Sequence, residues 1–331
     1  TMNTLTSVPY YALTAELTED YDERASLTTF RMILGVPAFM IGAAGTPIIV
    51  GLFATKSAGY GATGLIYAAI AAVVLWIAAA GIRERKKISE SKAETPPLRA
   101  LITTFRNRPF VRLIVAYLIA NVSFALIQTL LAYFLTYQLD MEDQVFIVMA
   151  LLLVSIGLFL FPWKMLAERW NKGPAYALGL AIGGLAVAST FLLPRGPTPL
   201  IYLIAVVAGI GFSAQWVFPW AMVPDVVEYD RLETGEYRGG MYYGVWGFTS
   251  KLTAALGLGL ASLVLEFSGY VANVEQTVGA LRGIRLFFGP VPLVFLILAL
   301  PLLIRYPITR KSHAEVLEKL EAIETDLEVH S

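Results

Sequence analysis

The stretch that decides the fold is "PWAMVPDVVEYDRLETGEYRGG", residues 219–240, because it joins two apolar runs that are each long enough to cross a bilayer. Its charged residues are Asp225, Glu228, Asp230, Arg231, Glu233, Glu236 and Arg238. The apolar run that follows carries one cation, Lys251. A charge at bilayer depth is costly unless it is paired or hydrated, so it marks a functional position. The alternative is a structural lysine that pairs with a carboxylate elsewhere.

The composition indicates an all-α, polytopic membrane protein. The 331-residue chain is 57% hydrophobic and 15% charged, whereas about a quarter of the residues of a soluble domain are charged. No apolar run shows the alternation of a barrel strand. The formal net charge is zero, so we expect no nucleic-acid partner. The chain has no cysteine, and its only histidines are His313 and His330, so we expect no metal site, no cofactor and no enzyme activity.

The spacing of apolar runs predicts eight membrane spans after a partial first one at 1–14. They cover about 28–53, 60–82, 110–137, 144–166, 174–193, 200–223, 241–267 and 284–305. Lysine and arginine concentrate in the 83–108 segment, the 164–173 and 224–240 loops and the carboxyl-terminal tail, which we therefore place in the cytoplasm.

We expect four parts along the chain. Residues 1–82 form the remainder of an amino-terminal bundle, 83–108 a cytoplasmic linker, 109–305 a six-helix bundle and 306–331 a cytoplasmic amphipathic tail. In the tail, Val316, Leu320, Ile323 and Leu327 recur at helical spacing. Such a helix either binds a partner or rests on the bundle. The chain begins at Thr1 and its opening resembles the end of a helix, so we expect that an amino-terminal portion is missing; Met2 as the true start is the alternative.

Two further groups of residues are candidates for a solute site and a gate. Asn121 and Gln128 share one helical face with Tyr117 and Phe124, and amides at membrane depth need partners, either in a polar cavity or across a helix contact. Ion pairs on the cytoplasmic side can hold a gate shut; plain solvated loops are the alternative. The candidate gate residues are Asp20, Asp22, Arg24, Asp225, Glu228 and Arg238.

Several segments together resemble the glycoside–pentoside–hexuronide:cation symporters, the melibiose-permease-like branch of the major facilitator superfamily. "PDVVEYDRLETGEYRGGMYYGVWGFTSKLTAALG" is similar to that family's loop 10–11 and helix XI, and "PYYALTAELTEDYDERASLTTFRM" to the end of its helix IV, loop 4–5 and the start of helix V. "ALRGIRLFFGPVP" and "RYPIT" resemble the two ends of helix XII, and "AERWNKGPAY" the superfamily's loop 8–9 motif. The resemblance assigns residues 1–82 to the end of helix IV and helices V and VI, and 109–305 to helices VII–XII.

The resemblance also implies roles for individual residues. Lys251 matches the helix XI lysine near the sugar and cation sites, and Trp216 matches the helix X tryptophan beside the sugar. Tyr11 falls where melibiose carriers have a sugar-stacking tryptophan, and Ser7 where they have an aspartate that binds the galactoside, so an α-galactoside substrate is in doubt. The family's cation-site carboxylates lie on helix II, which the resemblance leads us to expect before the segment that corresponds to Thr1.

The resulting functional hypothesis is a secondary transporter that couples Na⁺ or H⁺ to uptake of a sugar or glycoside by alternating access. A same-fold transporter of a non-sugar solute such as a lysolipid, and a truncated remnant that does not transport, are the alternatives. We expect the full-length protein to bind the coupling cation. We further expect a monomer in the lipid bilayer, in the bacterial inner membrane, with the linker and carboxyl terminus in the cytoplasm.

Overall fold

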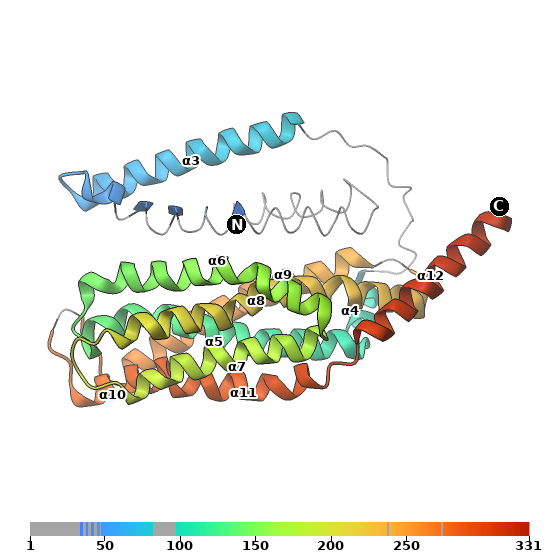
Figure 1. Ribbon diagram of the computed structural model, residues 1–331. Coiled ribbons are helices and arrows are strands. Elements are labelled where there is room, and N and C mark those ends of the chain that lie inside the picture. Colours follow the sequence, from blue (N-terminus) through green and yellow to red (C-terminus); the bar gives the residue numbers. More distant parts are fainter. Residues whose placement is uncertain are drawn as a thin grey trace. The chain divides into compact units, whose positions relative to one another are not determined.

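The computed structural model describes residues 34–35, 38, 41–42, 45–46, 48–81, 97–236, 238–272 and 274–330 (Figure 1). Within these ranges every regular element is a helix, which confirms the predicted all-α membrane fold. Among the described residues, seven segments are long and apolar enough to cross a membrane. The predicted span 28–53 lies largely outside the described residues, although those described between 34 and 51 are helical.

The chain divides into two compact units, Thr1–Thr95 and Pro96–Ser331. In unit 1, helix α3 spans Lys56–Gly81. Its Tyr67 lies beside residues of the preceding helical segment, with the hydroxyl 3.3 Å from Oγ1 of Thr46. The division between the units falls inside the 83–108 segment. The later part of that segment, Pro97–Thr104, forms the short helix α4.

Unit 2 contains six predicted spans and the tail. Its remaining helices are α5 (Arg108–Gln138), α6 (Val145–Arg169), α7 (Lys172–Ser189), α8 (Leu200–Thr234), α9 (Gly239–Phe267), α10 (Val278–Phe288), α11 (Pro290–Ile304) and α12 (Arg310–His330), with 3₁₀ turns at Glu142–Gln144 and Thr190–Leu192. Helix α8 packs against α6 and α7, α5 packs against α9 and α11, and α11 also packs against α7. Figure 1 shows these long helices running alongside one another.

Glycines allow α7 and α8 to approach at backbone distance. A Cβ atom added at Gly211 on α8 would lie 2.2 Å from the backbone nitrogen of Gly183 on α7. Small residues are typical of such membrane-helix contacts, because dispersion forces between closely packed backbones replace the hydrophobic effect. This crossing fixes the helix that carries Trp216 and Asp225 against the rest of the bundle.

Helix α8 extends further than the sequence predicts. The apolar run ends near residue 223, and residues 224–240 were expected to be a loop, yet the helix continues through Pro224 to Thr234. It ends at Gly235, whose φ of 73° lies in the left-handed region and whose N–H donates to the carbonyl of Arg231. Hydropathy predicts only the apolar part of a helix, whereas the end of α8 is set by a glycine, Gly235. We call this end of unit 2, where α8 ends and α12 begins, the tail end.

The predicted span 284–305 is also different in the structure, where two helices replace one. Helix α10 ends at Phe288 and α11 begins at Pro290, and Gly289 between them has φ −99° and ψ −82°. Proline lacks an N–H and disfavours helical geometry in the residue before it, which explains the break.

Within the predicted tail, Arg310–His330 forms helix α12, which packs against α8. Val316 and Leu320 are buried, whereas Glu315, Glu318 and Lys319 are exposed. Ile323 is 49% exposed, so the contact with the bundle involves the first part of the apolar stripe.

Candidate functional site

The polar residues predicted on α5 meet a partner on α9. The Asn121 amide nitrogen donates to Oγ1 of Thr253 at 2.6 Å, and lies 3.4 Å from the Tyr117 hydroxyl. Thr253 is fully buried and Asn121 is half-buried. The amide thus joins two span helices and also reaches the surface of the unit. Gln128, two turns further along α5, is exposed.

A series of aromatic contacts connects the α5 residue Tyr117 with α8. The Tyr117 ring lies 4.0 Å from that of Trp246 on α9, and Trp220 on α8 lies 6.3 Å from Trp246. Trp246 is buried, and no described residue accepts a hydrogen bond from its ring N–H. Trp216 lies one turn before Trp220 and is half-buried. Trp220 of α8 is therefore linked to the polar face of α5 through Trp246.

Lys251 is exposed on α9, between the buried residues Thr249 and Thr253. Added Cβ atoms at Gly244 and Gly247, on the same side of the helix, would meet no atom within 4 Å. This side of α9 therefore combines an ammonium group with open space along the backbone.

At the tail end, Asp225 lies in a buried ion pair. Both carboxylate oxygens accept hydrogen bonds from the ammonium of Lys172, at 2.7 and 2.8 Å, and the same ammonium donates to the carbonyl of Ala221 at 2.9 Å. The Asp225 side chain is 4% exposed and that of Lys172 is 26% exposed. Lys172 is the second residue of "NKGPAY", so the loop 8–9 motif supplies the cation that balances a carboxylate on α8.

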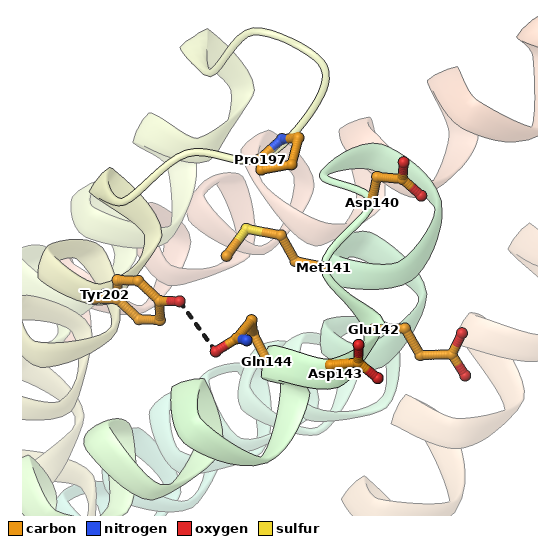
Figure 2. Close-up of a pocket in the computed structure, with 7 residues that line it drawn as sticks. All are labelled: Asp140, Met141, Glu142, Asp143, Gln144, Pro197 and Tyr202. Carbon is orange, nitrogen blue, oxygen red and sulfur yellow. Dashed lines mark hydrogen bonds between the residues drawn. The ribbon is translucent and has the colours of Figure 1, made fainter.

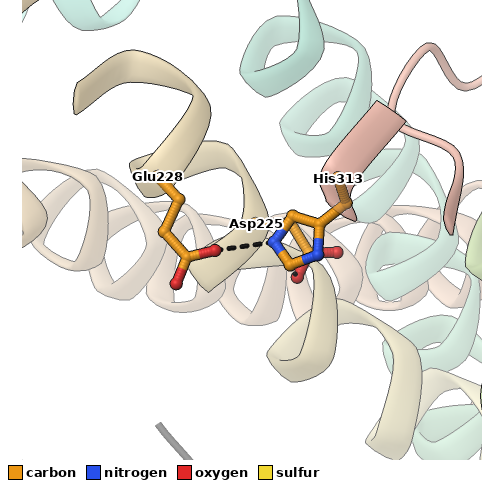
Figure 3. Close-up of side chains that lie close together, drawn as sticks. All are labelled: Asp225, Glu228 and His313. Atoms are coloured by element: carbon orange, nitrogen blue, oxygen red, sulfur yellow. Dashed lines mark hydrogen bonds and ion pairs between the residues drawn. The ribbon is translucent and has the colours of Figure 1, made fainter. Parts of the chain in front are cut away.

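His313, in the first turn of α12, reaches the same cluster (Figure 3). Its Nε2 atom lies 2.6 Å from a Glu228 carboxylate oxygen and 3.6 Å from one of Asp225. The contact with Glu228 is the main cause that raises the pKa of His313, and burial opposes it. The imidazole therefore favours its charged form in this position.

Arg238 pairs with a third carboxylate of α8. Its guanidinium donates to both oxygens of Asp230 at 2.6–3.0 Å, and Asp230 is buried. Among the described residues, the predicted gate residues Asp225 and Glu228 share His313, and Asp225 also pairs with Lys172, whereas Arg238 belongs to a separate ion pair. The partner of Arg238 is Asp230.

Asp225, Glu228 and His313 each offer a possible metal-ligand atom, and these atoms lie within 4.8 Å of one another. However, the Lys172 ammonium already contacts both oxygens of Asp225. A metal ion bound to Asp225 would be repelled by the Lys172 ammonium, which lies at hydrogen-bond distance from the same carboxylate. We therefore interpret the cluster as an ion-pair network.

The opposite end of unit 2 has a pocket between the α5–α6 connection and the start of α8 (Figure 2). It is lined by Asp140, Met141, Glu142, Asp143, Gln144, Pro197 and Tyr202. The Tyr202 hydroxyl donates to the Gln144 side-chain oxygen at 3.2 Å, and the three carboxylates are exposed. Exposed carboxylates are hydrated, so this pocket offers no desolvated binding group.

The remaining predicted site residues, Ser7, Tyr11, Asp20, Asp22 and Arg24, lie outside the described residues. The site residues that the sequence interpretation missed are Thr253, Lys172 and His313. The loop 8–9 motif contains Lys172 and gave a usable signal for it. The partnership of His313 had no local signal, because its partner is 85 residues away.

Comparison with known proteins gives consistent matches. The model of the family described as MFS/sugar transport protein matches residues 1–310. An uncharacterized symporter of Synechocystis sp. is 36% identical over 234 residues, 69% of this chain and 43% of the relative. An uncharacterized symporter of Bacillus subtilis is 27% identical, covering 95% of this chain and 69% of the relative. A sodium-dependent lysophosphatidylcholine symporter 1 of Gallus gallus is 26% identical, covering 95% and 66%. The chain thus matches less than half of the Synechocystis relative and about two thirds of the other two.

Proposed function

The chain belongs to the MFS/sugar transport protein family, and on this premise we propose that the protein is a secondary transporter that couples a cation gradient to uptake of a small solute. The proposed mechanism is alternating access between the two sides of the membrane. Within the superfamily we assign the chain to the glycoside–pentoside–hexuronide branch, on the motifs around Asp225 and Lys251. The proposed location is a bacterial inner membrane, with the tail end of unit 2 in the cytoplasm.

The observation that carries this proposal is Lys251, an exposed ammonium in the middle of an apolar helix of 29 residues. Such a charge is too costly to face lipid tails and instead faces protein or a water-filled cavity. The open space beside Gly244 and Gly247 leaves room for a solute on this side of α9. Asn121 on α5 and Thr253 on α9 form a hydrogen bond with each other, so further polar atoms lie on α9 and on its neighbour α5.

A sugar or glycoside is the first candidate solute. Amide and hydroxyl groups such as those of Asn121 and Gln128 donate and accept hydrogen bonds, as a hydroxyl-rich solute requires. The half-buried Trp216 on α8 offers a flat apolar surface with a polar edge, against which a sugar ring could stack. The description of the matching family supports the same class of solute.

A lysolipid is the second candidate, because one relative is named a sodium-dependent lysophosphatidylcholine symporter. In that case the Lys251 ammonium would bind the phosphate, and the exposed apolar side chains of α9, such as Leu252 and Leu256, would contact the acyl chain. The same relative's name makes Na⁺ the first candidate for the coupling cation, and H⁺ is the second.

Uptake by membrane vesicles that contain the protein tests this proposal. We expect a radiolabelled sugar or glycoside to accumulate above its external concentration when a Na⁺ gradient or a pH gradient is imposed. Ionophores that collapse the gradient should abolish the accumulation. Lysophosphatidylcholine in the same panel distinguishes the two solute classes. If no member of the panel accumulates under either gradient, the transporter proposal is wrong.

The Lys251→Ala variant tests the proposed site. Loss of the ammonium should lower coupled uptake at least about tenfold, the size expected when one charge-assisted contact of about 1.5–3 kcal/mol is lost. Lys251→Arg keeps the charge and should retain part of the uptake. Lys319→Ala, an exposed lysine of the tail, is the matched control and should transport normally. Full coupled uptake by Lys251→Ala at normal membrane levels would contradict this role.

A further inference from the structure

The start of α12 is held at a defined position on the bundle. Thr309 and Ser312 exchange hydrogen bonds, from the Thr309 N–H to the Ser312 hydroxyl at 2.8 Å and from the Ser312 N–H to the Thr309 hydroxyl at 3.2 Å. The Arg310 N–H donates to the side-chain oxygen of Asn171, in the turn before α7, at 3.1 Å. These contacts fix the first turn of the helix, which places the His313 ring against α8 (Figure 3).

Each element packed around His313 contributes a charged or titratable group. Helix α8 supplies Asp225 and Glu228, α7 supplies Lys172, and the segment before α12 supplies the buried Tyr306, which interacts with Asp225. Burial raises the pKa of Tyr306, so its phenol is neutral at physiological pH. With His313 protonated, two carboxylates face two cations and the cluster is neutral. With His313 neutral, the cluster keeps one uncompensated negative charge in a largely buried place, which is unfavourable.

We propose that His313 is a proton-binding switch that fastens the tail helix α12 to the end of α8 when it is protonated and releases it when it is neutral. The ligand of this site is a proton, and the conformational response is docking of α12. The docked helix covers Asp225 and Glu228, so docking restrains the end of the helix that also carries Trp216. The proposal concerns the contact of α12 with α8 and does not depend on which solute the protein moves.

The sign of the pH dependence follows from the difference between the docked and released states. Contact with Glu228 raises the pKa of His313 in the docked state, whereas a solvated histidine titrates near its ordinary pKa of about 6.5. Docking is therefore fully favoured below about pH 6.5 and is lost as the pH rises through the raised pKa of the docked state. Between the pKa of the released state and that of the docked state, the equilibrium constant for docking falls about tenfold for each unit by which the two pKa values differ.

Thiol accessibility measures docking directly, because the 331-residue chain has no cysteine of its own. A single cysteine introduced as Val316→Cys replaces a residue that is 7% exposed on the docked face. The matched control, Ala314→Cys, lies on the exposed face of the same helix. The alkylation rate of the first divided by that of the second corrects for the pH dependence of the thiolate. The full chain is measured in detergent with EDTA, from pH 5.5 to pH 9.

We expect this ratio to be low at acidic pH and to rise at least about fivefold as the pH increases, in line with the change in docking equilibrium. In the Glu228→Gln background the rise should move to lower pH, because the main cause of the raised pKa is removed. In the His313→Gln background the ratio should no longer depend on pH. A ratio that stays constant with His313 present, whether low or high, overturns the proposal, as does an unchanged pH dependence in His313→Gln. Since the readout involves no transport, its failure is distinct from failure of the proposed function.

Discussion

Among single side chains, the ion pair of Asp225 and Lys172 makes the clearest prediction about stability. Asp225→Asn leaves the ammonium without its buried counter-charge. Breaking a fully buried pair costs roughly 3–5 kcal/mol, and because the Lys172 side chain is 26% exposed we expect about 2 kcal/mol. The melting temperature in detergent at pH 6 should fall by about 5 °C.

The control for this experiment is Glu318→Gln, which neutralises an exposed glutamate of the tail and should change the melting temperature by less than about 1 °C. Combining Asp225→Asn with Lys172→Met removes the unpaired cation and should recover part of the loss. If Asp225→Asn melts like the unmodified protein, the pair contributes little and the structural role assigned to it is wrong.

The same residues show what could be predicted about the site. Asp225, Glu228 and Lys251 stand out in sequence because a charge inside or beside an apolar run is unusual, and this is a local property. Their partners are not local, because Lys172 is 53 positions from Asp225 and His313 is 85 positions from Glu228. Such pairs form only because the helices pack against one another, and the spacing of residues within one helix does not predict that packing.

For the helices, apolar length predicted the number of spans in unit 2 and their approximate positions. It misplaced the end of α8 and missed the break at Gly289, because both depend on glycine and proline rather than on hydropathy. The approach of α7 and α8 was likewise not predicted. Gly183 and Gly211 lie among many glycines, and only the packing distinguishes them from glycines that face open space.

This helix contact gives a prediction of its own. Gly211→Ala would place a Cβ atom 2.2 Å from the backbone nitrogen of Gly183, so the helices must separate. Overpacking of this kind typically costs about 1–3 kcal/mol, and we expect a lower melting temperature and a smaller yield of folded protein. Gly259→Ala, at an exposed position of α9 with no atom within 4 Å of the new Cβ, is the control. It should be neutral or slightly stabilising, and equal behaviour of the two variants would contradict the close approach.

For the protein as a whole, the distribution of lysine and arginine predicts which side of the membrane each connection occupies. The turn after α8 and the connection between α9 and α10 are separated by one span, so they must lie on opposite sides. Glu236, in the first connection, is half-buried, and Glu275, in the second, is exposed. We expect Glu236 in the cytoplasm, because the segments that share its side carry most of the basic residues.

Two single-cysteine variants, Glu236→Cys and Glu275→Cys, test this orientation in intact cells. A membrane-impermeant thiol reagent should label Glu275→Cys from outside, and should label Glu236→Cys only after the membrane is permeabilised. The unmodified chain, which has no cysteine, provides the background. Labelling in the reverse order would invert the orientation and place the His313 cluster outside the cell, where it would respond to external pH. Labelling of both variants from outside would contradict α9 as a membrane span.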